Sequence, residues 1–237
     1  MENYDIATMG NWHHDIAIAD GIRTSHLSSP YDMHAFTNKE SIAKEISRIY
    51  GTQLKDKNIL DIACNAGGHL FELNRFGIKA GFGFDVRPLW INQAHWVQRN
   101  IDIPCDNLKF VVGNFEVLKG FASHHFHLSL FNGIFYHLAN PIAELEKVAE
   151  KTSELIIVNT AYAPSHDDNT PALICKQESS KMVHGLSGVE GLSWLPNGEV
   201  VLYEILKHLG FPYYKLMFKN MDKKRLAVIA ARNKGLL

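Results

Sequence analysis

The sequence predicts an α/β fold, with a mostly parallel sheet, helices on both faces and an antiparallel hairpin at the C-terminal end. Three observations predict this fold. Between residues 57 and 161, short apolar runs alternate with longer amphipathic stretches, which is the pattern of strands and helices in a parallel sheet. The last two apolar runs are joined by the short charged turn NMDKK, which suits an antiparallel edge. The length of 237 residues fits one such domain.

The elements follow in order along the chain. Strands are expected at 57–63, 79–85, 107–114, 126–132, 153–161, 212–219 and 224–233. Helices are expected at 38–50, 67–76, 89–101, 140–152 and 197–209. In the first helix, Ile42, Ile46 and Ile49 recur at spacings of four and three, which marks one apolar face. The fourth helix has Asn140 as a cap and Pro141 in its first turn.

Two stretches fall outside the alternation. Residues 1–38 are expected to be irregular, as an N-terminal extension or lid on a domain that spans residues 39–237. Residues 162–195 are polar, interrupted by Pro and Gly, and longer than an ordinary connector. We expect this segment to be an insertion that faces the substrate. Its polar residues suited to a charged or hydroxylated substrate are His166, Asp167, Asp168, Lys176 and His184.

Composition narrows the class of protein. Lys and Arg total 24 against 25 Asp and Glu, a net charge of −1, which argues against a nucleic-acid partner and against an anionic membrane. No run of about 18 apolar residues predicts a membrane span. The N-terminus has no signal-peptide pattern, and three scattered cysteines fit a reducing compartment. We therefore expect a soluble, cytoplasmic protein.

His125 and His127 share one strand face without a Cys or carboxylate nearby, so no metal is expected. Nothing in the sequence indicates an oligomeric state.

The ends of the expected strands carry the residues that bind ligands in open parallel sheets. The first strand ends at Asp61 and a small-residue turn. The second ends at Asp85, which can accept hydrogen bonds from a ribose diol or cap the next helix. The third ends at Asn114 and Phe115, an amide and an aromatic ring that suit adenine. The fourth ends at Asn132 and Gly133, followed by Tyr136 and His137.

The turn after the first strand discriminates between cofactors. A dinucleotide pyrophosphate requires several glycines for close backbone approach, but this turn has only Gly67 and Gly68. That argues against a dehydrogenase. A nucleoside cofactor without phosphate requires fewer glycines in this turn, and Asn65 tolerates a left-handed backbone. S-adenosylmethionine, with a ribose, an adenine and an amino-acid tail, fits this arrangement.

Six segments carry a resemblance to a known family. They are WHHDIAIADGIRT, ILDIACNAGG, GFGFDVRPLWINQA, VVGNFEVL, LSLFNGIFYHLANP and WLPNGEVVLYEILKHLGF. Over about residues 11–212 the chain resembles class I S-adenosylmethionine-dependent methyltransferases. More narrowly, it resembles the branch related to the tRNA wobble-uridine carboxymethyltransferase, which includes small-molecule and glycan-associated members. The resemblance implies a Rossmann-like fold with a seven-stranded sheet.

The sequence departs from the family pattern at two places. The usual D-x-G-x-G-x-G becomes Asp61, Ala63, Asn65 and Gly67, and the common acid after the third strand is Asn114. Position by position, the resemblance assigns the methionine moiety to the turn, the ribose to Asp85, the nucleoside and adenine to the residues that follow the second and third strands, and the methyl end to those after the fourth. The residues so assigned are Asp61, Ala63, Cys64, Asn65, Gly67, Asp85, Val86, Arg87, Asn114, Phe115, Asn132 and Gly133.

The expected function is methyl transfer to a hydroxyl, or with less support an amine, of a small molecule or sugar derivative. His137 is the candidate base, because an unperturbed histidine titrates near neutrality; it could equally be a structural histidine at the helix entry. Tyr136 would orient the acceptor or face the methyl group, and Trp12, His13 and His14 would form part of a lid.

Two alternatives remain open. One is tRNA wobble-uridine modification by (carboxy)methyl transfer, which requires a basic face and a cation for the extra carboxylate, with Arg87 the nearest in sequence. The other is a non-catalytic protein that binds S-adenosylmethionine.

Overall fold

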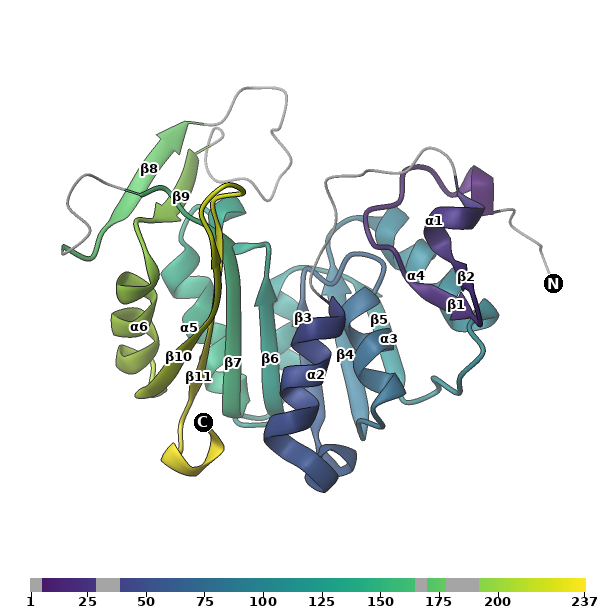
Figure 1. The fold of residues 1–237 in the computed structure, drawn as a ribbon, viewed down its shortest axis with the longest axis horizontal. Helices are drawn as coiled ribbons and strands as arrows, with labels where there is room; N and C mark the ends of the chain where they lie inside the picture. The colour runs from purple at the N-terminus through teal and green to yellow at the C-terminus, as the bar shows by residue number, and fades with distance from the viewer. Residues whose placement is uncertain (1–5, 29–38, 165–169, 178–191) are drawn as a thin grey trace. The chain divides into compact units, whose positions relative to one another are not determined.

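The computed structural model describes residues 6–28, 39–164, 170–177 and 192–237 (Figure 1). Seven strands form one sheet in the order β10-β11-β7-β6-β3-β4-β5. The strands are β3 (Asn58–Ile62), β4 (Ala80–Asp85), β5 (Leu108–Val112), β6 (Phe126–Asn132), β7 (Thr152–Ala161), β10 (Tyr213–Asn220) and β11 (Arg225–Ala231). The pairs β3/β4, β4/β5 and β6/β7 are parallel, whereas β11 pairs antiparallel with both β7 and β10. The predicted α/β sheet with its C-terminal antiparallel hairpin is confirmed.

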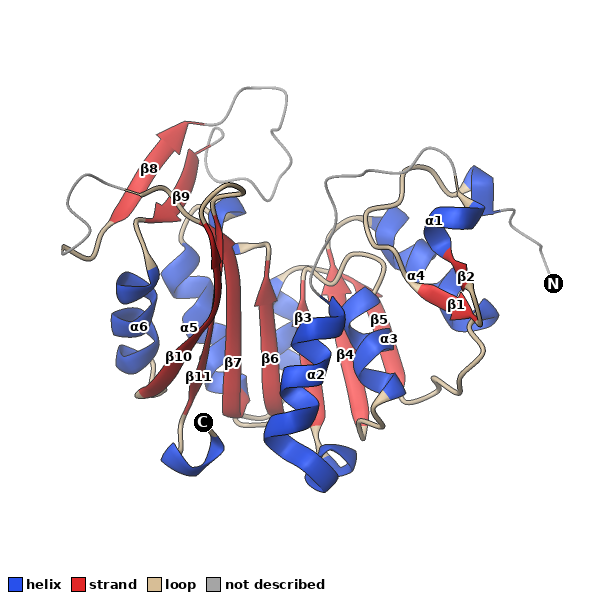
Figure 2. Ribbon diagram, in the orientation of Figure 1, coloured by secondary structure: helices blue, strands red, loops and turns tan. Residues whose placement is uncertain are grey.

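The chain divides into two compact units, the first of which ends at Asn114. Its helices are α2 (Lys39–Tyr50), α3 (Gly68–Arg75) and α4 (Pro88–Asn100), and a 3-10 helix covers Gly51–Asp56. Ile42 and Ile46 are buried, as the apolar periodicity predicts, while Ile49 at the edge of the stripe is half-buried. Helices α2 and α3 pack on each other and lie in front of β3 and β4 in Figure 2.

The second unit begins at Phe115 and carries β6, β7, β10 and β11. Its helices are α5 (Pro141–Lys151) and α6 (Glu199–His208), with 3-10 helices at Phe115–Gly120, Phe135–His137 and Lys234–Leu236. Asn140 caps α5 as predicted, because its Oδ1 accepts the Ala143 amide at 3.3 Å. Strand β11 lies between β10 and β7 and is buried at every position after Arg225, which explains its apolar run from Leu226 to Ala231.

The prediction that residues 1–38 are irregular was wrong for the described part of that stretch. β1 (Ala17–Ala19) and β2 (Ile22–Arg23) form an antiparallel pair, followed by α1 (Thr24–Leu27), and a 3-10 helix covers Ile6–Thr8. Gly21 has φ +69° and makes the tight turn between the two strands. Strands of three and two residues are too short to show a period of two in the sequence. The division into an extension at 1–38 and a domain at 39–237 stays a prediction.

The segment at 162–195 also contains structure that its polar sequence did not predict. β8 (Leu173–Gln177) and β9 (Leu192–Pro196) form an antiparallel pair. Buried Asn197 holds the base of this pair, because its Oδ1 accepts the Ala172 amide at 3.0 Å and its Nδ2 donates to the Thr170 carbonyl at 2.7 Å. The polar residues His166, Asp167, Asp168 and His184 and the side chain of Lys176 lie outside the described part.

Candidate active site

The turn after β3 keeps the backbone of a glycine motif with only one of its glycines. Ala63, Asn65 and Gly67 have φ of +53°, +52° and +76°, so all three positions are left-handed. They are the positions where the family has glycine, and a non-glycine residue pays about 1–2 kcal/mol in this region. Local hydrogen bonds offset that cost, because the Ala66 amide donates to Asn65 Oδ1 at 2.7 Å and the Gly67 amide to the Cys64 carbonyl at 2.9 Å. Ala63 and Asn65 replace two glycines of the motif but preserve the shape of its backbone.

We expect Gly67→Ala to destabilise the protein more than Gly77→Ala, its matched control. Both glycines are left-handed, at φ +76° and +81°. A Cβ at Gly67 would lie 2.5 Å from Cε1 of the Phe110 ring, whereas a Cβ at Gly77 would meet nothing within 4 Å. Gly77→Ala should lower the free energy of unfolding by about 1 kcal/mol, and Gly67→Ala by about 2–4 kcal/mol, because overpacking adds to the strain. Denaturant unfolding measures both, and equal losses would contradict the role of Phe110.

Two buried carboxyl groups lie at the ends of β3 and β4. Asp61 and Asp85 are each 1% exposed. Asp85 Oδ2 accepts the Asn65 amide at 3.1 Å and its Oδ1 accepts the Arg87 amide at 3.0 Å. Arg87 is the N-cap residue of α4 and has no side-chain cap bond. Asp85 therefore joins the turn after β3 to the chain before α4 and is not the N-cap residue of that helix. Its carboxylate has further lone pairs for ligand hydroxyls.

Asp61 has the chemistry of a cation-binding group. Its Oδ2 is buried and has no hydrogen-bond partner among the described residues. Burial, and secondarily the neighbouring Asp85, raises the pKa of Asp61 well above its ordinary value. Burial also raises the pKa of Asp85, against the lowering effect of the Arg87 and Asn65 amides. A buried carboxyl of this kind gains from a positively charged ligand. The ammonium of an amino-acid tail meets that requirement, so these residues fit S-adenosylmethionine.

The other predicted cofactor residues of the first unit lie near this turn or along the next two strands. Cys64 is buried, and burial raises the pKa of its thiol well above the ordinary value, which disfavours the reactive thiolate. Val86 is half-buried, and the Arg87 guanidinium lies 4.0 Å above the Trp90 ring. The Gly113 amide donates to the Asp85 carbonyl at 2.9 Å, which places Asn114, an exposed residue, beside the end of β4.

The second unit holds the remaining predicted residues. Phe115 is buried against Phe131, with ring centroids 6.3 Å apart. Asn132 is half-buried at the end of β6, and Gly133 has φ +71°. Its amide donates to the carbonyl of Asn159 in β7 at 2.8 Å.

Tyr136 and His137 form a pair on the 3-10 turn after β6. Both are half-buried, and their ring centroids are 4.2 Å apart. Arg225, from the start of β11, donates from Nη2 to the Tyr136 hydroxyl at 2.9 Å, and its guanidinium lies 4.8 Å from the centre of that ring. Arg225 was not predicted as a site residue, since nothing in the local sequence links it to a tyrosine 89 residues away.

In the described residues, no group of three or more His, Cys, Asp and Glu side chains is placed to hold a metal ion. No described helix is both long enough and apolar enough to span a bilayer.

The fold and this site define a class I methyltransferase, the class that uses S-adenosylmethionine as its cofactor. The chain belongs to the methyltransferase domain family, whose sequence model it matches over residues 53–226. The predicted fold class, enzyme class and cofactor are thereby confirmed. The roles of the individual site residues stay predictions.

Similar proteins include two curated tRNA U34 carboxymethyltransferases. That of Alteromonas mediterranea is 28% identical over 181 residues, which cover 73% of this chain and 51% of the relative. That of Aliarcobacter butzleri is 30% identical over 96 residues, covering 40% of this chain and 30% of the relative. The chain spans about half the length of the first relative and less of the second.

Solved structures share the fold at low identity. The N-terminal domain of EvdMO1 with SAH bound has a TM-score of 0.73 and 17% identity, over 96% of this chain and 94% of that one. The 1,6-didemethyltoxoflavin-N1-methyltransferase of Burkholderia thailandensis has a TM-score of 0.55 and 14% identity, over 84% and 81%. At such identities these structures bear on the fold alone.

Proposed function

We propose that this protein transfers a methyl group from S-adenosylmethionine to a hydroxyl, or with less support an amine, of a small molecule or sugar derivative in the cytoplasm. The Tyr136–His137 pair carries the proposal. An imidazole whose ordinary pKa lies near neutrality suits a general base. The neighbouring Tyr136 hydroxyl is oriented by Arg225, so it can position an acceptor.

The proposed roles in cofactor binding follow the residues already described. The Asp61–Gly67 turn holds the amino-acid tail, with Asp61 as the counter-charge. Asp85 accepts the ribose hydroxyls, Val86 and Arg87 line the nucleoside, and Asn114 and Phe115 contact adenine. Asn132 and Gly133 approach the methyl end. When bound, the cofactor supplies a methyl group on a positively charged sulfur. His137 removes the acceptor proton, and Tyr136 orients the acceptor oxygen.

The nature of the acceptor is inferred from charge. The net charge of −1 provides no long-range attraction to a polyanion. The segment expected to face the substrate, 162–195, is polar and suits hydroxyl groups.

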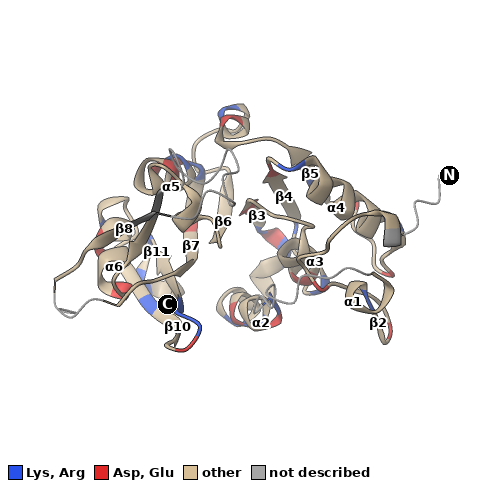
Figure 3. Cartoon of the chain, turned by 90° about the horizontal axis from the view of Figure 1, so that it is seen from above, with Lys and Arg blue, Asp and Glu red and all other residues tan. Residues whose placement is uncertain are grey.

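A second candidate function is carboxymethyl transfer to a tRNA wobble uridine. Arg225 is the observation that favours it, because a carboxylated cofactor needs a cation and this guanidinium lies beside the candidate catalytic pair. Arg87, by contrast, lies over Trp90. Figure 3 shows basic residues on β10 and at the turn that leads into β11. The lysines of β10 are Lys215 and Lys219, and those of the turn are Lys223 and Lys224. Basic side chains of this kind suit a phosphate backbone.

Titration with S-adenosylmethionine and with its carboxylated form separates the two functions. We expect the wild-type protein to bind S-adenosylmethionine at least about tenfold more tightly, a difference of about 1.4 kcal/mol. We also expect Arg225→Ala to change that affinity little. The control is Lys223→Ala, which removes an exposed cation from the turn just before β11. Tighter binding of the carboxylated form, lost in Arg225→Ala but not in Lys223→Ala, would replace the proposed function by the second one.

A non-catalytic protein is the remaining alternative. It predicts cofactor binding without methyl transfer to any acceptor, whereas the proposed function predicts S-adenosylhomocysteine release with at least one hydroxyl compound in an acceptor screen.

A further inference from the structure

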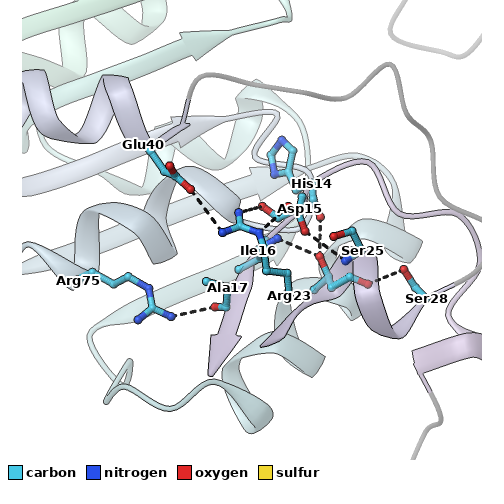
Figure 4. A network of polar contacts seen from close by, with 10 residues as sticks. His14, Asp15, Ile16, Ala17, Arg23, Ser25, Ser28, Glu40 and Arg75 are labelled. Atoms are coloured by element: carbon cyan, nitrogen blue, oxygen red, sulfur yellow. Dashed lines mark hydrogen bonds and ion pairs between the residues drawn. The ribbon is translucent and has the colours of Figure 1, made fainter. Parts of the chain in front are cut away.

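The N-terminal segment 12–25, which we call the clasp, is anchored to the first unit along its length. Buried Trp12 lies edge-on to Trp96, with ring centroids 5.9 Å apart. The Gln93 amide donates to the Asn11 carbonyl at 2.9 Å, just before the clasp. Further along, the Arg75 guanidinium donates to the Ala17 carbonyl at 2.9 Å (Figure 4).

Hydrogen bonds from other residues of the clasp hold the backbone at His14. The Thr24 hydroxyl donates to the His14 carbonyl at 3.0 Å and accepts the Ile16 amide at 2.9 Å. Arg23 Nε donates to Asp15 at 2.6 Å, and Asp15 also accepts the Ser25 amide at 3.2 Å; Figure 4 shows these side chains around His14. These bonds fix the backbone on both sides of His14.

The imidazole of His14 reaches the start of α3, directly after the candidate cofactor turn. The Gly68 amide donates to His14 Nδ1 at 3.1 Å, in buried surroundings. A backbone N–H only donates, so Nδ1 must carry a lone pair and the ring must be uncharged. A Cβ at Gly68 would lie 2.8 Å from Nδ1 and 2.7 Å from Cδ of Lys39, so this close approach requires glycine.

The groups that face His14 all disfavour a proton on its ring. They are Lys39 from α2, His69 from α3 and His13 from the clasp. Burial first, and then these three groups, lowers the pKa of His14 well below its ordinary value. Burial lowers the pKa of Lys39 to about 8 and that of His69 to about 3.

We infer that His14 is a positioning residue for the cofactor turn, and that protonation of its ring in acid detaches the clasp from Gly68 and weakens S-adenosylmethionine binding. The coupling to binding rests on the proposed placement of the cofactor's amino-acid tail on the Asp61–Gly67 turn. Gly68 adjoins that turn, so loss of its hydrogen bond frees the turn to move.

The direction of the pH effect follows from linkage. In the attached clasp the pKa of His14 is depressed, whereas in a detached clasp it returns to about 6.5. The detached state then binds more protons, so the stability of the clasp is fully present above about pH 6.5 and declines as the pH falls below it. Between pH 8 and pH 5.5 the ratio of detached to attached clasp should rise about tenfold.

Hydrogen exchange of the Gly68 amide in the cofactor-free protein tests the clasp. After correction for intrinsic exchange, wild-type protection should fall about tenfold from pH 8 to pH 5.5. In His14→Asn the side-chain oxygen takes the place of Nδ1 and does not titrate, so protection should persist with little pH dependence. In His14→Ala it should be lost at both pH values. His69→Asn should behave like the wild type.

Each departure from these results overturns the inference. Constant wild-type protection, or the same acid-induced loss in His14→Asn, removes His14 as the titrating group, and loss of the pH dependence in His69→Asn assigns it to that residue.

Calorimetry tests the coupling to the cofactor. At pH 8, His14→Ala should bind S-adenosylmethionine about tenfold more weakly than His14→Asn. If these two variants bound with equal affinity while the exchange results were as expected, the His14–Gly68 contact would be supported. Its effect on cofactor binding would be overturned. Lack of binding by the wild type would overturn the proposed cofactor site, and the exchange arm would still decide the role of His14.

Discussion

Asp85→Ala is expected to weaken S-adenosylmethionine binding at least about 100-fold, which corresponds to about 2.7 kcal/mol. The carboxylate accepts the buried Asn65 amide and the partly buried Arg87 amide, and a buried donor left unpaired costs about 1–3 kcal/mol. Asn65 would also lose the bond that stabilises its φ of +52°. The variant therefore loses the proposed ribose acceptor and the shape of the turn together. Calorimetric titration at pH 8 measures the loss.

Two further variants show which property of Asp85 matters. Asp85→Asn keeps the volume and one acceptor oxygen, so we expect an affinity between those of the wild type and Asp85→Ala. Asp106→Ala removes an exposed carboxylate outside the site and should bind like the wild type. If Asp85→Ala kept full affinity with an unchanged circular dichroism spectrum, neither the ribose role nor the structural role of Asp85 would stand.

His137→Ala is expected to lower kcat by about 10²–10⁴-fold, the range of general base catalysis. The measurement uses a hydroxyl acceptor that the wild-type protein turns over, and follows release of S-adenosylhomocysteine. Affinity for S-adenosylmethionine should stay within about twofold, because the proposed role of His137 is in the chemical step. Tyr136→Phe, which removes the hydroxyl that Arg225 contacts, should cause a smaller fall.

The control for this experiment is His208→Ala, a histidine near the end of α6 that lies outside the candidate site. It should leave kcat unchanged. A His137→Ala protein with wild-type kcat would show that His137 is a structural residue of the 3-10 turn, and the proton would then have to leave by another group.

The α/β class and the position of every strand in the large sheet, to within two residues at either end, could be predicted from the local sequence. The five long helices were predicted equally well. Helix and strand periods are local, and a buried strand such as 126–132 is recognised from its own apolar side chains. The strand ends with Asp61 and Asp85 were predicted for the same reason, because parallel strands deliver their carboxyl ends to one edge of a sheet.

The contacts between side chains that are distant in sequence could not be predicted and are known only from the folded structure. The Gly68 amide reaches His14 across 54 residues, and the Arg225 guanidinium reaches the Tyr136 hydroxyl across 89. The short strand pairs β1/β2 and β8/β9 likewise could not be predicted from their own sequences, because they form by pairing across strands. Such contacts depend on how separate elements pack, and packing is set by the whole apolar core and not by any local period. The scaffold of this methyltransferase could thus be predicted from sequence, whereas the partners of its site residues required the fold.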